Sequence, residues 1–87
     1  MVHEVASVLS RYIAAAMGEA RYRILDDGNF FGEIPGLNGV WAAEPTLESC
    51  RQVLQEVLEE WLVLKLRDGD PIPAVGGVAL KVESVAT

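Results

Sequence analysis

Residues 21–34 read RYRILDDGNFFGEI, and this run decides the fold. Polar and apolar residues alternate at its start, which is typical of a strand with one buried face. The DDGN sequence at 26–29 favours a tight turn, because Gly and Asn tolerate positive φ and Asp bonds its own backbone. In the return segment, 30–34, Phe31 and Glu33 share the face opposite to the other three residues. The run therefore predicts a β-hairpin with strands at 21–25 and 30–34.

Further strands follow from the flanking residues. The run PGLNG at 35–39 is a second turn, and 40–43 is a short third strand that ends before Pro45. Apolar residues alternate with polar or small ones over 78–85, which predicts a last strand. These segments make an antiparallel meander with one more strand at the end.

Two helices are predicted around the meander. Apolar residues recur at spacings of three and four over 4–17, and Gly18 follows. Thr46 is a good N-cap for a second helix that runs to about Arg67, and Gly69 ends it. The residues expected on the buried stripe of the second helix are Leu47, Cys50, Leu54, Val57, Leu58, Trp61 and Leu62.

The predicted element order is α-β-β-β-α-β. An antiparallel meander sheet packed with helix belongs to the α+β class. A chain of 87 residues has room for one core, so we expect a single domain at 1–87. It consists of an N-terminal helix at about 4–17 and a core at about 21–85.

The charge, the cysteine content and the apolar runs of the chain restrict the classes of function that fit it. Seven basic residues against thirteen acidic ones give a net charge of −6, which disfavours binding to a phosphate backbone and fits a basic partner. One cysteine cannot form an internal disulfide, and no apolar run reaches the roughly 18–20 residues of a membrane span. The first residues also lack the basic region of a signal peptide. We therefore expect a cytoplasmic protein without a membrane partner.

Three runs, in this order and spacing, carry a family resemblance. Residues 22–40 read YRILDDGNFFGEIPGLNGV, residues 46–48 read TLE at the start of a helix that contains Trp61, and residues 69–73 read GDPIP. The chain resembles the HicB-like antitoxins, formerly an uncharacterised small-protein family, over about 22–73.

The resemblance implies a fold and a partner. The fold is a HicB-like, partial RNase H-like sheet with helix, and the protein forms a homo-oligomer such as a dimer or tetramer. The partner is a HicA-type toxin, a small basic RNA-cleaving protein whose catalytic surface the antitoxin covers. The complex typically represses its own operon.

The sequence departs from the family pattern in three places. The family turn Leu-Pro-Gly-Cys is Leu37-Asn38-Gly39-Val40 here, which loosens the turn. The helix at 4–17 resembles a subgroup with such an extension. Only residues 68–87 follow the second helix, too few for the family's C-terminal DNA-binding part, so no direct nucleic-acid binding is expected of this chain.

The candidate residues for a partner or subunit interface form two sets. Aromatic residues lie on the predicted strands, where one sheet face must be covered by the first helix or by another molecule. Trp41 either packs under that helix or covers an interface, whereas Trp61 belongs to the core. Acidic residues line the outer face of the second helix, either simply solvated or docking a basic toxin. The two sets are Tyr22, Phe31 and Trp41, and Glu56, Glu59 and Glu60.

Other chemistry-bearing residues are weaker candidates. An RNase H-like fold invites a metal-nuclease reading of Asp26, Asp27 and Glu33, but such chemistry needs carboxylates that converge from several elements. Cys50 lies on the apolar stripe without a base nearby, and His3 is terminal. We expect no catalytic residue, metal or cofactor.

The sequence therefore predicts a HicB-like type II antitoxin-type protein that binds and occludes a small basic HicA-type toxin and is not an enzyme. The alternative is a stand-alone homo-oligomeric regulatory module of the same family that has no toxin.

Overall fold

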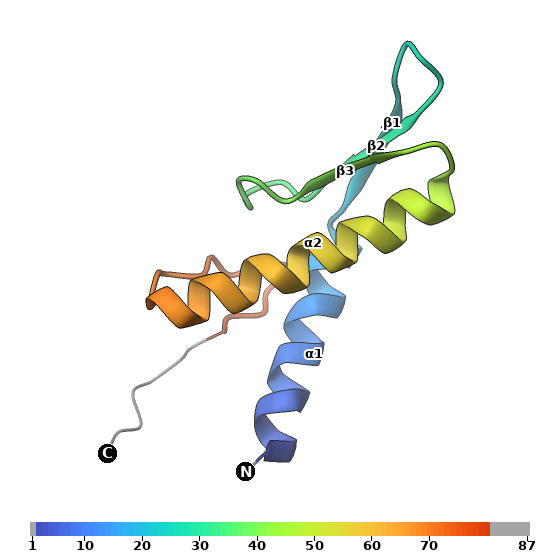
Figure 1. Ribbon diagram of the computed structural model, residues 1–87. Helices are drawn as coiled ribbons and strands as arrows, with labels where there is room; N and C mark the ends of the chain where they lie inside the picture. The colour runs from blue at the N-terminus through green and yellow to red at the C-terminus, as the bar shows by residue number, and fades with distance from the viewer. Residues whose placement is uncertain (1, 81–87) are drawn as a thin grey trace.

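The computed structural model describes residues 2–80, and their side chains from Val8 onward. The elements are α1 (Val2–Gly18), β1 (Arg21–Ile24), β2 (Phe30–Glu33), β3 (Trp41–Glu44) and α2 (Leu47–Asp68). Figure 1 shows α2 lying along the sheet, while α1 projects away from it. The predicted α+β class and the order from the first helix to the second are confirmed.

The sheet is an antiparallel meander in the order β1-β2-β3. Its hairpin closes as the sequence predicts, with Gly28 at φ 90° and the amide of Asn29 donating to Asp27 Oδ1 at 2.9 Å. In the second turn Gly36 and Gly39 both have a φ of 89°, a conformation that β-carbons disfavour. Glycine at these positions lets the chain reverse twice within a short sequence.

Helix α2 begins and ends at its predicted caps. The Thr46 side chain accepts a hydrogen bond from the amide of Ser49 at 3.0 Å. Gly69 adopts the left-handed conformation at φ 71°, and its amide donates to the carbonyl of Leu66. These caps satisfy backbone groups that the helix itself leaves free, so the bounds of α2 are set locally.

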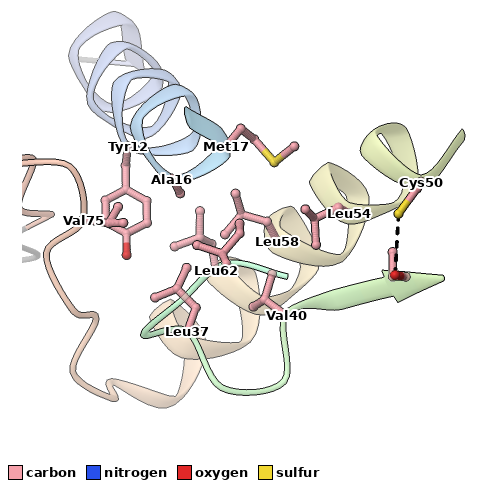
Figure 2. Close-up of a cluster of buried hydrophobic side chains, with 12 residues drawn as sticks. Tyr12, Ala16, Met17, Leu37, Val40, Cys50, Leu54, Leu58, Leu62 and Val75 are labelled. Atoms are coloured by element: carbon pink, nitrogen blue, oxygen red, sulfur yellow. Dashed lines mark hydrogen bonds between the residues drawn. The ribbon is translucent and has the colours of Figure 1, made fainter. Parts of the chain in front are cut away.

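The core lies where α2, the C-terminal half of α1 and the second turn meet (Figure 2). Leu54 and Leu58 of α2 are fully buried, as are Tyr12 and Ala16 of α1. The Tyr12 hydroxyl donates to the carbonyl of Pro73 at 2.5 Å, which ties α1 to the segment after α2. The remaining core residues are Met17, Ile34, Leu37, Val40, Ala42, Cys50, Leu62 and Val75.

The structure excludes one of the alternatives for the sheet face and corrects one residue of the predicted buried stripe. Helix α1 packs on α2 and, within residues 2–80, contacts no strand of the sheet, so it does not cover the free sheet face. Leu47, predicted on the buried stripe, is 47% exposed, because it is the first residue of α2 and no preceding helical turn flanks it. Val57 and Trp61 are half-buried at the edges of the core.

The predicted last strand at 78–85 is described only in part. Val78 pairs with Val75 in an isolated bridge that closes a turn at Gly76 and Gly77. The sheet of the described residues therefore has three strands. Residues 81–85 of the predicted strand lie outside the described residues.

Candidate functional site

The three predicted glutamates lie on the solvent-exposed face of α2. Glu56, Glu59 and Glu60 are all exposed, opposite the fully buried side chains of the same helix. Two apolar residues continue this line: Val63 is 62% exposed and Leu64 is 48% exposed. Together these five residues line a shallow depression, which we call the acidic helix surface.

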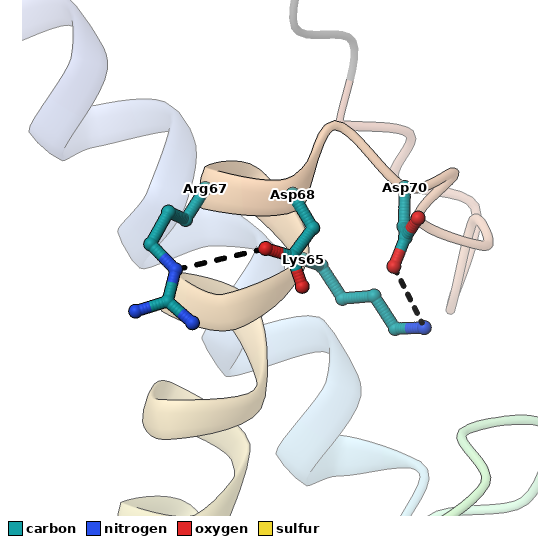
Figure 3. Close-up of polar contacts among 4 residues, drawn as sticks. All are labelled: Lys65, Arg67, Asp68 and Asp70. Carbon is teal, nitrogen blue, oxygen red and sulfur yellow. Dashed lines mark ion pairs between the residues drawn. The ribbon is translucent and has the colours of Figure 1, made fainter.

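The carboxylates of the acidic helix surface are available to another molecule. Glu59 accepts one hydrogen bond, from Gln55 Nε2 at 3.2 Å, and none of the three glutamates forms an ion pair within the described residues. The basic residues at the end of α2 pair elsewhere, Lys65 with Asp70 and Arg67 with Asp68 (Figure 3). These pairs are partly exposed, at 3.9 and 3.6 Å, and contribute little to stability.

A second surface is the sheet face that α2 does not cover, which we call the open face. Cross-strand register places Arg21, Glu33 and Trp41 in one row, and Arg23, Phe31 and Ala43 in the next. Directly paired residues of an antiparallel sheet share a face, so these six side chains lie together.

The open face has an ordered aromatic centre. The rings of Phe31 and Trp41 are stacked with centroids 5.9 Å apart and planes 23° apart. The guanidinium carbon of Arg23 lies 4.8 Å from the centroid of Phe31, a cation–π contact. Trp41 is 54% exposed, so of the two alternatives for this residue the structure excludes packing under the first helix.

Tyr22 belongs to the opposite, covered face. It pairs with Gly32, and a β-carbon on Gly32 would lie 2.8 Å from the Tyr22 ring and 3.2 Å from Cys50 Sγ. Tyr22 is half-buried, and its hydroxyl oxygen is buried with no partner among the described residues. Burial raises its pKa, although the charge of Arg51 opposes the shift. The structure therefore separates Tyr22 from Phe31 and Trp41.

Cys50 is a core residue, as predicted. It is fully buried, and its thiol donates to the carbonyl of Ala42 at 3.6 Å. Burial and, secondarily, the charge of Glu44 raise its pKa, which keeps the thiol protonated and unreactive. The side chain of His3 lies outside the described part of the chain.

The carboxylates considered for a metal-nuclease site, which include Asp27 and Glu33, do not converge on one point. Both Asp27 oxygens face Asn29 within the hairpin turn, at 2.9 and 3.4 Å. Glu33 lies at the far end of β2, opposite Arg21. Among residues 2–80 no three His, Cys, Asp or Glu side chains are grouped to hold a metal ion.

Some residues of these surfaces were missed by sequence reasoning. Val63 and Leu64 follow Glu59 and Glu60 by about one helical turn, so they lie on the same polar side of α2. Helical periodicity could therefore have identified these two apolar residues as exposed. Arg23 could have been placed beside Phe31 only by knowing the register of the hairpin, which sets the partner of every residue.

The family match covers most of the chain. The model of the UPF0150-like family matches residues 11–73, and the chain belongs to this family of HicB-like, small antitoxin-type proteins. The nine helical residues 2–10 precede the matched region.

A solved structure has the same fold. The chain is similar to the crystal structure of TTHA0281 from Thermus thermophilus, with a TM-score of 0.82 and 40% sequence identity. The similarity covers 87% of this chain and 95% of that protein's chain. A search of the curated proteins gave no match. Neither described helix is long and apolar enough to cross a membrane.

Proposed function

We propose that this protein is a HicB-like antitoxin-type protein that binds a small basic HicA-type RNA-cleaving toxin and covers its catalytic surface. The observation that carries the proposal is the acidic helix surface. Its exposed apolar residues, Val63 and Leu64, are bordered by three glutamates without ion pairs in the described part of the chain. An apolar centre with a charged rim is the usual anatomy of a protein interface.

The negative charge of the acidic helix surface favours a basic partner. The chain carries −6, so a basic partner is attracted from a distance, and the local glutamates orient its approach. Once docked, Val63 and Leu64 lose contact with water, which adds an attraction that salt does not screen. Inhibition is then steric, with no catalysis or cofactor contributed by this chain.

We also propose that the protein belongs to a subgroup of the family with an additional N-terminal helix. Helix α1 begins before the family-matched region, which fits the subgroup with an N-terminal extension. Operator binding, if the complex represses its operon, is supplied by another chain. The protein acts in the cytoplasm, where its toxin meets RNA.

The test begins with tagged protein recovered from its own host, at low and at high salt, with the bound proteins identified by mass spectrometry. The expected result is a stoichiometric small basic protein that leaves only in denaturant. That protein, purified alone, should cleave RNA, and adding the antitoxin back should stop the cleavage. Recovery of this chain alone, repeated at native expression, contradicts the proposal.

A charge-matched pair of variants tests the surface. Changing Glu56, Glu59 and Glu60 to Gln is expected to slow association with the toxin by about tenfold at low salt, and less at high salt. The control removes three other carboxylates, with Asp26→Asn, Glu44→Gln and Glu48→Gln, so its net charge is the same. Equal rates for the two variants would remove the acidic helix surface from the interface.

The second candidate is a stand-alone homo-oligomeric module of the family without a toxin. The uncovered aromatic centre of the open face favours it, because a surface of this kind is typical of a contact between proteins. Recovery of this chain alone in the same experiment supports this candidate.

A further inference from the structure

We propose that the notch between α1 and α2 receives a basic amphipathic helix of the partner protein. The inference rests on the proposed function, and it adds which kind of segment of the small basic partner is bound and which part of α1 binds it. The notch has a volume of about 440 Å³. Its lining includes Ile13, Ala14 and Met17 from α1, and Arg51, Gln55 and Glu59 from α2.

The α1 side of the notch is apolar. Met17 follows Ala14 by three residues and Ile13 by four, so the three side chains share one face of α1. Ile13 is half-buried, Ala14 is exposed, and Met17 points toward α2 (Figure 2). Figure 1 shows α1 projecting away from α2, and among the described helices and strands α1 contacts only α2. The short side chain of Ala14 therefore leaves room for a larger apolar side chain of a partner.

The α2 side of the notch is polar and leads to the acidic helix surface. Gln55 Nε2 donates to Glu59 Oε2 at 3.2 Å, which holds the Glu59 carboxylate at the edge of the notch. Glu59 also lines the acidic helix surface, so the two depressions adjoin. Together they form one site, in which an apolar wall on α1 is followed by three carboxylates on α2.

The charges give the bound segment a direction. Arg51 precedes Glu59 by eight residues, which is about 12 Å along the axis of α2. A basic segment is repelled at Arg51 and attracted at Glu59 and Glu60. It therefore extends from the notch toward the C-terminal half of α2, where Val63 and Leu64 are exposed.

An amphipathic helix has the chemistry that this site requires. The bound segment must offer apolar side chains to the notch and to Val63 and Leu64, and positive charge to the glutamates between them. A helix carries an apolar and a basic face along its whole length, with its anchors three and four residues apart. From Gln55 to Leu64 the rise along α2 is about 14 Å, so two to three helical turns of the partner fill the site.

Other occupants are disfavoured by charge. A second copy of this chain carries −6 and would bring its own glutamates to this site. A nucleic acid would place its phosphates against the same carboxylates. Binding of an oligonucleotide in the notch, or self-association that is lost when the notch is filled, would overturn the proposal.

The test is isothermal titration calorimetry of the full chain with two synthetic peptides of about four helical turns. Both contain the same lysines, leucines and alanines. In the first peptide the leucines are three and four residues apart, and in the second the order is scrambled. The first is expected to bind about tenfold more tightly, because only it presents an apolar face to the notch. Equal binding of the two peptides, or no binding of either, would overturn the proposal.

Variants show whether the peptide lies in the notch. Ala14→Gln fills the notch with a longer side chain and is expected to weaken binding of the first peptide about tenfold. Ala79→Gln is the matched control, because Ala79 is also exposed but does not line the notch. Glu59→Gln should weaken binding more than Asp26→Asn, which removes the same charge at the hairpin. Circular dichroism melting shows that each variant is folded, and unchanged binding in Ala14→Gln would contradict the proposal.

Failure of the notch and failure of the proposed function give different results. If a basic toxin is recovered from the host and Ala14→Gln inhibits it as well as the wild-type chain does, the proposed function stands and the notch is wrong. If the first peptide binds in the notch but this chain is recovered alone, the toxin is wrong and the notch remains a site for basic helices.

Discussion

The covered and open faces of the sheet are built from alternate residues of the same strands, so they share a backbone and differ only in side chains. On the covered face Gly32 and Ala42 are small and buried, which lets α2 approach closely. On the open face the corresponding rows hold arginines, Phe31 and Trp41. The covered face thus carries small side chains beside the packed rings of Tyr22 and Phe30, whereas the aromatic pair of the open face has no described element packed on it.

Helix α2 repeats this division around its own axis. Its inner line, which includes Leu54 and Leu58, is fully buried, whereas its outer line presents glutamates with Val63 and Leu64. Buried and exposed apolar residues therefore occur on one helix, and only the first kind contributes to the core. The comparison predicts that stability and binding respond to different sets of substitutions.

The largest effect is expected from truncating the inner line. Leu58→Ala should lower the free energy of unfolding by about 2–5 kcal/mol, because it removes a fully buried side chain and leaves a cavity. Val63→Ala, on the outer line of the same helix, should change it by less than about 1 kcal/mol. Urea denaturation measures both, and similar losses would abolish the distinction between the two lines.

A smaller loss is expected from filling the gap on the covered face. Gly32→Ala places a methyl group 2.8 Å from the Tyr22 ring and 3.2 Å from Cys50 Sγ, so the helix or the ring must move. We expect a cost of about 1–3 kcal/mol in thermal or urea denaturation. Gly18→Ala is the control, since a β-carbon there meets nothing within 4 Å. A neutral Gly32→Ala would show that α2 does not press on this strand.

A gain is expected at Tyr22. Its hydroxyl oxygen is buried without a partner among the described residues, and such a group costs free energy when taken from water. Tyr22→Phe should keep the ring packing and stabilise the fold by about 1 kcal/mol. A clear loss of stability in urea would mean that the hydroxyl is hydrogen-bonded after all. The change should leave self-association untouched, because Tyr22 is not on the open face.

The smallest effect is expected at alkaline pH, where the free energy of unfolding should fall because of three buried groups. Burial raises the pKa values of Tyr12, Tyr22 and Cys50 in the folded chain. Unfolded thiols ionise near pH ~8.5 and unfolded tyrosines near pH ~10, so the folded state holds these protons longer. The stabilisation is complete below about pH 8.5 and is lost as the pH rises through the raised folded values.

Urea titrations between pH 7 and pH 10.5 measure this dependence. Cys50→Ala should delay the onset of the loss toward the tyrosine range, while Trp41→Phe on the open face should leave the profile unchanged. A free energy of unfolding that stays constant over the whole range would contradict the assigned burial.

Local chemistry explains what the sequence could predict. The DDGN turn, the Thr46 cap and the Gly69 stop act through neighbouring residues, so the hairpin and α2 have nearly the predicted bounds. The stripe of α2 was mostly predictable too, because period 3.6 sets which residues share a face.

Tertiary packing explains what the sequence could not predict. Alternation placed Phe31 opposite Phe30 but could not say which face α2 would cover, so Tyr22 was grouped with Phe31 and Trp41. Whether α1 packs on the sheet or on α2 depends on the path of the chain after Gly18, which periodicity does not encode. The contact between Arg23 and Phe31 required the hairpin register.

The most direct test of the difference between the two sheet faces is the fluorescence of Trp41, measured in a variant that has no other tryptophan. In a Trp61→Phe variant, the emission maximum and acrylamide quenching of Trp41 are followed over a wide range of protein concentration. The open face as an interface predicts a solvated indole in dilute solution, then a blue shift and loss of quenching as the chain associates. An indole that stays solvated while sedimentation shows association would place the interface elsewhere and contradict the account.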